Sequence, residues 1–308
     1  MKTAFLFAGQ GSQCQGMGKD LYEAYPAFAR VIDGANLSID LKKMMFEAEM
    51  EELSVTRNTQ PCMAAFGAGV SEVLKEAGIR PDYVAGLSLG EYTALYAAGV
   101  FSAEEFLPLV AFRGQVMDAA AQGISCRMSA VMGMDKKELA GLCEQVRAKG
   151  EDFYVTVSNY NCTGQYVICG KTAGVEETEE LCRERGVKRI VPLKVSGPFH
   201  TKYMEPAAKE LERYLADVTF GEMECPVIFN TTARPLAQGD TIASQLVKQV
   251  QNSIYMEDTI QYLEKQGVER IIEIGPGKTL SGFVKRTAPA IECMSITDVD
   301  SLEAVLKA

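Results

Sequence analysis

A serine and the chain's single histidine are the residues whose types suit covalent chemistry. Ser88 lies in a Gly-Leu-Ser-Leu-Gly run at positions 86–90, directly after the apolar run 83–85. This G-x-S-x-G spacing is typical of a serine on a sharp strand-to-helix turn, where side chains at the glycine positions would collide with the backbone. A serine hydroxyl needs a base to take its proton, and only His200 supplies an imidazole. The pattern predicts a serine nucleophile with a histidine base.

The competing interpretation is a glycine-flanked turn serine and a structural histidine. His200 follows an apolar strand predicted at 187–193, and the carboxyl edge of a strand is where α/β enzymes place catalytic side chains. The order serine, then histidine, matches serine hydrolases, yet no acidic residue stands out as the third member of a triad. A backbone carbonyl is the alternative group to orient His200.

Arg113 is the second informative residue. A capping-box pattern starts a predicted helix at 102–121, on which Phe106, Val110, Arg113 and Met117 share one apolar stripe. A buried guanidinium needs an anion, because an unpaired buried charge is costly. Three interpretations remain: an internal salt bridge, a side chain that reaches solvent, or a planar fork that binds a substrate carboxylate.

A glycine-rich loop follows the first predicted strand. The loop at 9–13 has the composition of a strand-to-helix turn, or it supplies one N–H of an oxyanion hole, with Leu89 supplying the second. Cys14 replaces the third glycine of a dinucleotide fingerprint. The later Lys278 is no P-loop lysine, because Ile272 stands at the first glycine position. Nucleotide phosphate binding therefore has no support.

The composition excludes several classes of protein. The 308 residues are 47% hydrophobic and 23% charged, as in a globular protein, and a net charge of -10 argues against nucleic-acid binding. One histidine and 9 cysteines without a C-x-x-C pair argue against a metal site. No apolar stretch suits a signal peptide or a membrane span. We expect a cytoplasmic protein that needs no metal.

The order of predicted elements is that of an α/β protein. An apolar strand at 4–8 precedes a helical region, and Gln60-Pro61 opens a helix over 63–77. Strands that alternate with helices imply a parallel sheet. Further predicted elements are a helix at 205–216, a strand at 227–230, helical segments between 242 and 265, and a strand at 270–274.

The middle of the chain has a different order of predicted strands and helices. From about Cys126 the predicted order is β-α-β-β-α-β, which is the ferredoxin-like arrangement. We therefore expect a small ferredoxin-like domain at residues 125–193, inserted into a large α/β domain formed by residues 1–124 and 194–308.

Taken in order, the motifs resemble those of the malonyl-CoA:acyl carrier protein transacylase family and of acyltransferase domains in fatty-acid and polyketide synthases. They are GQGSQ at 9–13, QP at 60–61, GLSLGE at 86–91, FRG at 112–114, NYN at 159–161, SGPFH at 196–200 and EIGPG at 273–277. The resemblance spans essentially the whole chain. One position departs from it: many members have histidine before the serine, where this chain has Leu87.

The resemblance implies a hydrolase-like α/β fold with a ferredoxin-like insertion, and it implies the catalytic roles. Ser88 would be the nucleophile and His200 the base. The backbone amides of Gln10 and Leu89 would form the oxyanion hole, and the main-chain carbonyl of Gln249 would orient the histidine.

The resemblance also implies the substrate contacts. Arg113 would bind the free carboxylate of the malonyl group, and Gln60 and Asn159 would join it in substrate binding. Phe199, the aromatic residue before the histidine, accompanies a preference for malonyl over branched extender units in related acyltransferases.

The implied reaction is ping-pong transfer of malonyl from malonyl-CoA to the phosphopantetheine thiol of holo-acyl carrier protein, which supplies fatty-acid synthesis. No cofactor is implied, and we expect a monomer. Carrier proteins are acidic, so a local basic patch should receive them. Its candidate residues are Lys188, Arg189, Lys194, Lys285 and Arg286. Two alternatives stay open: a serine esterase or thioesterase, in which water accepts the acyl group, and a non-catalytic interaction module.

Overall fold

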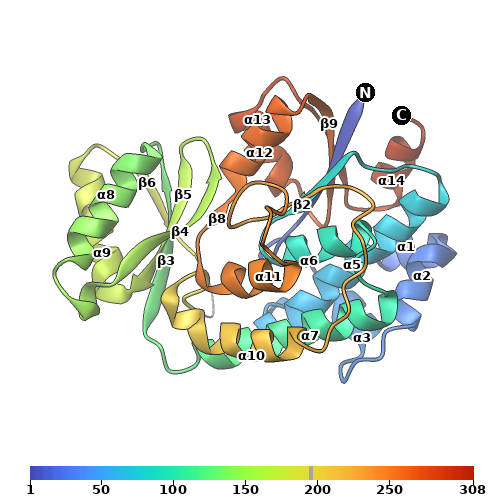
Figure 1. Cartoon of the computed structure of the whole chain (residues 1–308), viewed down its shortest axis with the longest axis horizontal. Coiled ribbons are helices and arrows are strands. Elements are labelled where there is room, and N and C mark those ends of the chain that lie inside the picture. Colours follow the sequence, from blue (N-terminus) through green and yellow to red (C-terminus); the bar gives the residue numbers. More distant parts are fainter. Residues whose placement is uncertain (194–196) are drawn as a thin grey trace.

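The computed structural model describes residues 1–193 and 197–308, so Lys194 and Ser196 of the sequence analysis lie outside the described residues. Two five-stranded sheets organise the chain, with strand orders β10-β9-β1-β2-β7 and β6-β3-β5-β4-β8. The second sheet lies at one end of the molecule, and most helices surround the first sheet at the other end (Figure 1). The predicted α/β class is confirmed.

The first sheet is parallel, and both of its faces are buried. Its strands are β1 (Lys2–Phe7), β2 (Tyr83–Gly86), β7 (Val227–Ile228), β9 (Val268–Ile274) and β10 (Glu292–Ile296). On β1, Phe5 and Phe7 join one apolar cluster while Ala4 and Leu6 join another, because successive side chains of a strand alternate between faces. A strand covered on both faces requires a continuous apolar run, as this segment has.

Helices build both apolar clusters. The cluster around Phe5 and Phe7 takes side chains from α1 (Lys19–Ala24), α2 (Pro26–Asp33), α3 (Leu41–Phe46), α4 (Met50–Leu53), α5 (Thr56–Glu76), α6 (Leu89–Ala97), α7 (Ala103–Ala121), α10 (Glu205–Leu215), α11 (Ile242–Gln251) and α14 (Val299–Leu306). The other cluster takes them from α12 (Met256–Lys265) and α13 (Thr279–Thr287). The predicted capping box of Ser102 and Glu105 is present at α7. Among the described residues, no helix has the length and apolar character to cross a membrane.

α5 begins earlier than the sequence predicts. Gln60-Pro61 was expected to open this helix, whereas the helix begins at Thr56 and carries Pro61 inside it. Proline removes one backbone donor from a helix interior. Packing against α7 supports the helix: a Cβ at Gly114 would lie 3.1 Å from Cα of Arg57. The expected start is wrong because this contact between the two helices outweighs the missing donor.

The second sheet has the predicted β-α-β-β-α-β order. Its elements are β3 (Cys126–Met132), α8 (Lys136–Arg147), β4 (Val155–Cys162), β5 (Gln165–Lys171), α9 (Thr172–Glu184) and β6 (Arg189–Pro192). β5 pairs antiparallel with both β3 and β4, and β6 pairs antiparallel with β3. A further strand, β8 (Ile254–Tyr255), pairs parallel with β4. The sequence analysis placed only helix there, because so short a strand has no periodicity to read.

The turn from β2 to α6 leaves no room for side chains at its two glycines. A Cβ on Gly86 would lie 2.0 Å from the carbonyl carbon of Gly90, and a Cβ on Gly90 would lie 2.1 Å from the carbonyl oxygen of Phe7. Both neighbours are backbone atoms of packed elements, so they cannot move aside. The backbone therefore excludes a side chain at either glycine, as the G-x-S-x-G spacing predicts.

We predict that Gly90→Ala lowers the free energy of unfolding by about 3 kcal/mol, because the added methyl overpacks the contact with β1. Gly141→Ala is the matched control, since its site within α8 has no atom within 4 Å of the added Cβ. This change should raise stability by about 0.5–1 kcal/mol. Urea unfolding followed by circular dichroism measures both changes, and equal midpoints for Gly90→Ala and the parent chain would contradict the steric account.

Candidate active site

Ser88, His200 and Arg113 meet beyond the carboxyl end of β2. Nε2 of His200 lies 2.8 Å from Oγ of Ser88, and Nη2 of Arg113 donates to the same oxygen at 3.1 Å. The φ of Ser88 is 54°, a left-handed conformation that non-glycine residues adopt only where the surrounding structure enforces it. The structure thus brings the predicted serine and histidine into hydrogen-bond contact, with the arginine beside them.

His200 follows the strand predicted at 187–193, which the structure forms as β6 and places in the second sheet. This is the sheet in which the sequence analysis put that strand. The backbone N–H of His200 donates to the carbonyl of Val250 on α11 at 3.1 Å.

Hydrogen bonding and burial set the protonation of His200. Its Nδ1 lies 2.8 Å from the carbonyl oxygen of Gln249. A carbonyl oxygen only accepts, so Nδ1 carries the proton and Nε2 presents a lone pair to the Ser88 hydroxyl. Burial lowers the pKa of His200 to about 4; the Gln249 carbonyl opposes this shift and the charge of Arg113 adds to it. The imidazole is therefore neutral at pH 7 and able to accept a proton.

Arg113 is buried without an ion-pair partner. Its side chain is 1% exposed, and the predicted apolar stripe is confirmed by the burial of its neighbours. Nη1 donates to Oε1 of Gln60 at 2.7 Å, and Nη2 donates to Oε1 of Gln249 at 2.9 Å. No carboxylate among the described residues forms an ion pair with it. The internal salt bridge that the sequence left open is therefore absent from this part of the chain.

Glu91 is the acidic neighbour that influences Arg113. Burial raises the pKa of Glu91 to about 8, opposed by a hydrogen bond from Asn230 and by the charge of Arg113. At pH 7 its carboxyl is mostly protonated and contributes little negative charge. Burial in turn lowers the pKa of Arg113. An anion from outside the protein is then the natural partner for the guanidinium.

Two backbone N–H groups border the serine. Leu89 opens α6, where the first N–H groups of a helix lack partners within the helix. Gln10 follows Gly9, whose Cβ position would lie 2.4 Å from the carbonyl oxygen of Leu87, so the two loops adjoin. The N–H groups of Gln10 and Leu89 donate to no acceptor among the described residues. Such a pair of free donors suits an oxyanion.

Gln60, Asn159 and Phe199 are the remaining predicted substrate contacts. Gln60 contacts Arg113 directly. Asn159 lies on β4, where its Oδ1 accepts from the hydroxyl of Ser158 at 2.8 Å, and no hydrogen bond within the described residues joins Asn159 to the site. Phe199 is buried in the main apolar cluster. The structure therefore places Gln60 in the site through a hydrogen bond, and it shows none between Asn159 and the site among the described residues.

Two side-chain amides belong to the site and were missed by the sequence analysis. Oδ1 of Asn230 accepts from the backbone N–H of Ser88 at 2.7 Å, and Nε2 of Gln249 donates to the carbonyl of Ser88 at 2.8 Å. Asn230 offered a signal, because it ends the predicted strand at 227–230, and side chains at the carboxyl ends of parallel strands gather at one edge. The side chain of Gln249 offered none.

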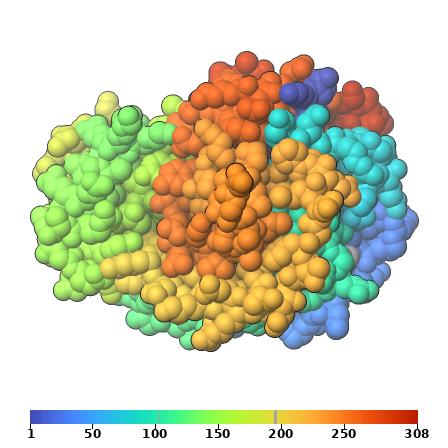
Figure 2. All heavy atoms as spheres, in the orientation of Figure 1, coloured from blue at the N-terminus to red at the C-terminus, as the bar shows by residue number. Residues whose placement is uncertain are grey.

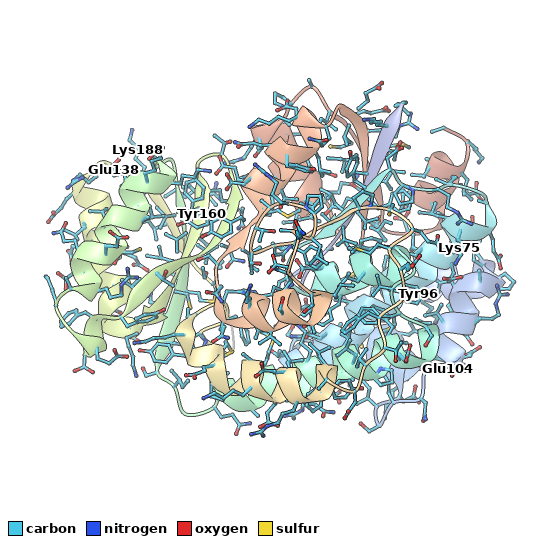
Figure 3. All side chains as sticks on the ribbon, in the orientation of Figure 1. Lys75, Tyr96, Glu104, Glu138, Tyr160 and Lys188 are labelled. Atoms are coloured by element: carbon cyan, nitrogen blue, oxygen red, sulfur yellow. The ribbon has the colours of Figure 1, made fainter. Side chains whose placement is uncertain are left out.

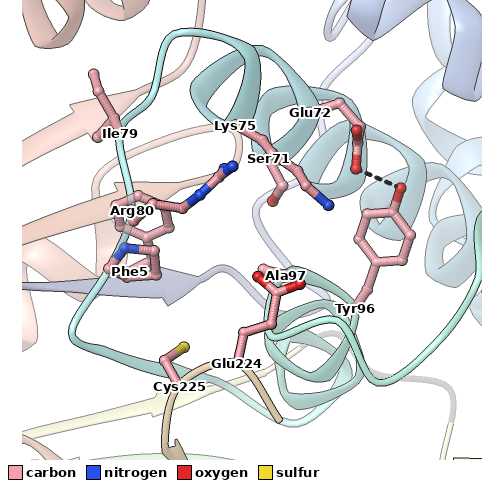
Figure 4. Close-up of a pocket in the computed structure, with 11 residues that line it drawn as sticks. Phe5, Ser71, Glu72, Lys75, Ile79, Arg80, Tyr96, Ala97, Glu224 and Cys225 are labelled. Atoms are coloured by element: carbon pink, nitrogen blue, oxygen red, sulfur yellow. Dashed lines mark hydrogen bonds between the residues drawn. The ribbon is translucent and has the colours of Figure 1, made fainter. Parts of the chain in front are cut away.

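Two cavities lie elsewhere. One of about 170 Å³ is lined by Phe5, Ser71, Glu72, Lys75, Ile79, Arg80, Pro81, Tyr96, Ala97, Glu224 and Cys225 (Figure 4). Another of about 460 Å³ lies where α8 and β4 approach the segment 231–234, and Figure 2 shows the green and orange surfaces of these regions in contact. Neither cavity is lined by the serine, histidine or arginine of the site. The described residues include no cluster of ligands for a metal ion.

A parallel-sheet α/β protein that holds a serine on a strained turn against a neutral histidine fits the class of enzymes that carry acyl groups on serine. A family model described as "Acyl transferase domain" matches residues 4–303. The chain therefore belongs to the acyl transferase family, and the resemblance identified from its motifs is confirmed.

The relatives and solved structures to which this chain is similar include malonyl transacylases. The malonyl CoA-acyl carrier protein transacylase of Bacillus subtilis is 41% identical over 308 residues, which cover 99% of this chain and 96% of the relative. MCAT from Streptococcus pneumoniae is similar with a TM-score of 0.93 and 42% identity, covering 99% of both chains. A malonyl-transacylase in complex with its type II PKS acyl-carrier protein is similar with a TM-score of 0.94 and 34% identity, covering 100% of this chain and 99% of that one.

We predict that His200 titrates near pH 4 rather than near the usual 6.5, since burial disfavours the charged imidazole. The chain has 1 histidine, so one ring resonance in a proton–carbon NMR titration reports it. Protonation begins only as the pH falls toward 4, and the base stays available above that range. Arg113→Ala should raise the midpoint, because it removes a nearby positive charge. Titration between pH 6 and 7 in the folded parent chain would contradict the prediction.

Proposed function

We propose that this chain transfers the malonyl group from malonyl-CoA to the phosphopantetheine thiol of holo-acyl carrier protein. One observation supports this function above others: a buried guanidinium with neutral hydrogen-bond partners lies 3.1 Å from the hydroxyl of Ser88. A malonyl thioester carries a carboxylate close to its reactive carbonyl. With that carboxylate on Arg113, the carbonyl carbon comes within reach of Ser88.

The first half-reaction loads the serine. Nε2 of His200 takes the proton of Ser88 Oγ while that oxygen attacks the thioester carbonyl carbon. The N–H groups of Gln10 and Leu89 stabilise the negative charge that develops on the carbonyl oxygen. The carbon–sulfur bond then breaks, and the coenzyme A sulfur leaves with the proton held by His200. A malonyl-serine ester and free coenzyme A remain.

The second half-reaction unloads the serine along the same path. The phosphopantetheine thiol of the carrier protein gives its proton to His200, and its sulfur attacks the ester carbonyl carbon. The ester carbon–oxygen bond breaks, and Ser88 Oγ recovers the proton from His200. One thioester is consumed and one is formed, so the reaction needs no cofactor. The Gln249 carbonyl keeps the imidazole in the tautomer that both halves require.

Selectivity comes from Arg113 and Gln60. A carboxylate accepts two parallel hydrogen bonds from a guanidinium, whereas an acetyl or longer neutral acyl group leaves the buried charge unpaired. Gln60 accepts from Nη1 and thereby orients the guanidinium plane. Phe199, buried just before His200, limits the volume beside the base. Asn159 stays a proposed contact for the remainder of the substrate, without support from hydrogen bonds.

The finer description of the fold is also a proposal. We assign residues 1–124 and 194–308 to a large hydrolase-like domain and residues 125–193 to an inserted ferredoxin-like domain. The strand order β6-β3-β5-β4 with α8 and α9 against one face supports the second assignment. The short β8, from the carboxyl-terminal segment, pairs with β4 and joins the two units.

Docking of the carrier protein requires positive charge on an acidic chain. Lys188, Arg189, Lys285 and Arg286 are exposed and form no ion pair with another described residue. Figure 3 shows Lys188 at the outer end of the second-sheet elements. We propose these residues as the docking patch of a monomeric enzyme. A cytoplasmic location is proposed as well, and it agrees with nine cysteines that are all free thiols.

We predict that the parent chain, mixed briefly with malonyl-CoA and no acceptor, gains the mass of one malonyl group, because Ser88 forms the ester and no second thiol removes it. Ser88→Ala should gain nothing, and acetyl-CoA should label the parent poorly. Intact-protein mass spectrometry measures all three samples. Free malonate accumulating without an adduct would instead identify a thioesterase, and intact malonyl-CoA without an adduct would exclude this acyl donor.

We predict that Arg113→Ala lowers kcat/KM for malonyl-CoA on the order of 100-fold or more, because one partner of a buried charge pair is lost. The activity on acetyl-CoA relative to malonyl-CoA should rise. Arg57→Ala is the control, since this arginine is 56% exposed and pairs with Asp118 on the surface. Steady-state kinetics on both thioesters measure the ratio. An unchanged malonyl preference in Arg113→Ala would exclude the carboxylate role.

A further inference from the structure

We infer that Asn230 is the positioning residue of the serine turn: its side-chain amide bonds both peptide groups that flank Leu87 and thereby holds Ser88 in its strained conformation. Nδ2 of Asn230 donates to the carbonyl of Gly86 at 2.7 Å, and Oδ1 accepts from the N–H of Ser88 at 2.7 Å. This inference rests on the proposed function for the reaction that Ser88 performs, although the geometry stands without it.

The side chain of Asn230 continues the sheet where the backbone of β2 leaves it. The paired residues of β2 and β7 are Val84 with Val227 and Ala85 with Ile228. In a parallel ladder, the N–H and C=O of one residue bond the two groups that flank one residue of its neighbour. The Asn230 amide offers the same N–H and C=O to the turn. It replaces a peptide group that β7 no longer provides there.

The turn needs such support because its conformation is unfavourable. Ser88 has φ 54° and ψ −103°, and a residue held so far from the common regions relaxes unless several contacts fix it. Gln249 contributes one contact, from Nε2 to the carbonyl of Ser88 at 2.8 Å. Asn230 contributes two on the amino side of the serine, and its Oδ1 also accepts from Nε2 of Gln249 at 3.5 Å.

Asn230 is itself held by a buried carboxyl group. Its side chain is 0% exposed, and its backbone N–H donates to Oε2 of Glu91 in the first turn of α6. Glu91 therefore connects Asn230, which holds the serine turn, to α6, the helix that follows the turn. With both ends fixed, the amide cannot follow the serine if the turn relaxes.

The consequence concerns rate rather than affinity. Oγ of Ser88 lies 2.8 Å from His200 because the backbone at Ser88 is fixed, and a small displacement breaks that contact. Asn230 has no hydrogen bond to Arg113. It reaches one partner of Arg113, Gln249, at 3.5 Å, whereas Gln60 and the ring of Tyr92 hold the guanidinium independently of Asn230. Loss of the two Asn230 hydrogen bonds to the turn should slow attack by Ser88 and leave binding of the malonyl carboxylate nearly unchanged.

The test uses the full chain and two substitutions of Asn230, with Thr178→Ala as the control. Asn230→Ala removes both hydrogen bonds to the turn. We expect this variant to be slower on the order of 100-fold in two reactions of Ser88: labelling by diisopropyl fluorophosphate and the first turnover with malonyl-CoA. The Kd of malonyl-CoA, measured by calorimetry in a Ser88→Ala background, should change less than about threefold. A 100-fold loss in rate without a matching loss in affinity would show that Asn230 positions the serine and does not bind the substrate. Intact-protein mass spectrometry follows both labelling reactions.

Asn230→Asp keeps the shape of the side chain and decides the case if the alanine variant does not fold. A neutral aspartic acid restores the donor to Gly86, whereas an ionised one repels that carbonyl, and burial favours the neutral form. Its labelling rate should therefore rise as the pH falls from 7 to 5, a range in which Glu91 is mostly protonated and His200 mostly neutral, so that the parent rate stays nearly flat. Thr178→Ala, which removes a buried hydroxyl on α9 that donates to Gly174 at 2.8 Å, should label like the parent.

Rates within about threefold of the parent for both Asn230 variants would overturn the inference, given that misplacement of a reacting group costs far more. Equal slowing in Thr178→Ala would overturn it too, because the effect would then reflect a general loss of packing. Failure of the proposed function is distinguishable: a parent chain that reacts with the fluorophosphate but not with malonyl-CoA has an intact serine turn and a different acyl donor.

Discussion

The site depends on a buried positive charge that meets only neutral partners. Arg113 contacts two side-chain amides and one hydroxyl, and the nearby carboxyl of Glu91 is mostly protonated at pH 7. Removing a guanidinium from water without a counter-ion costs several kcal/mol. The rest of the fold supplies that free energy through its packed core, and under the proposed function the unpaired charge distinguishes a malonyl group from a neutral acyl group.

The same charge explains why the site is built from amides. A carboxylate next to His200, as in a serine–histidine–aspartate triad, would also lie close to Arg113 and would compete with an acidic substrate for it. A backbone carbonyl orients the imidazole without adding a negative charge. Neutral amides at Gln249 and Asn230 likewise hold the serine turn. The base and the serine turn are thereby oriented without a negative charge beside Arg113.

The sequence predicted those parts of the site that have local signatures. The glycine spacing around Ser88, the unique His200 and the stripe position of Arg113 can each be read from one segment. Asn230 offered only its place at the end of a predicted strand, and the side chain of Gln249 offered no signal, because the contacts of both residues join segments far apart in the chain. The same reason accounts for α5, which begins before Pro61 because α7 packs against it, and for β8, which is too short to show a pattern.

Gln249 contacts His200 through its main-chain carbonyl, and it contacts Arg113 and Ser88 through its side-chain amide. A substitution at this position deletes the second set of contacts and leaves the first. The orientation of the base is therefore encoded in the path of α11 and not in the identity of any side chain. A different residue at this position would thus change what holds Arg113 and Ser88 while the histidine kept its orientation, as long as the helix ends in the same place.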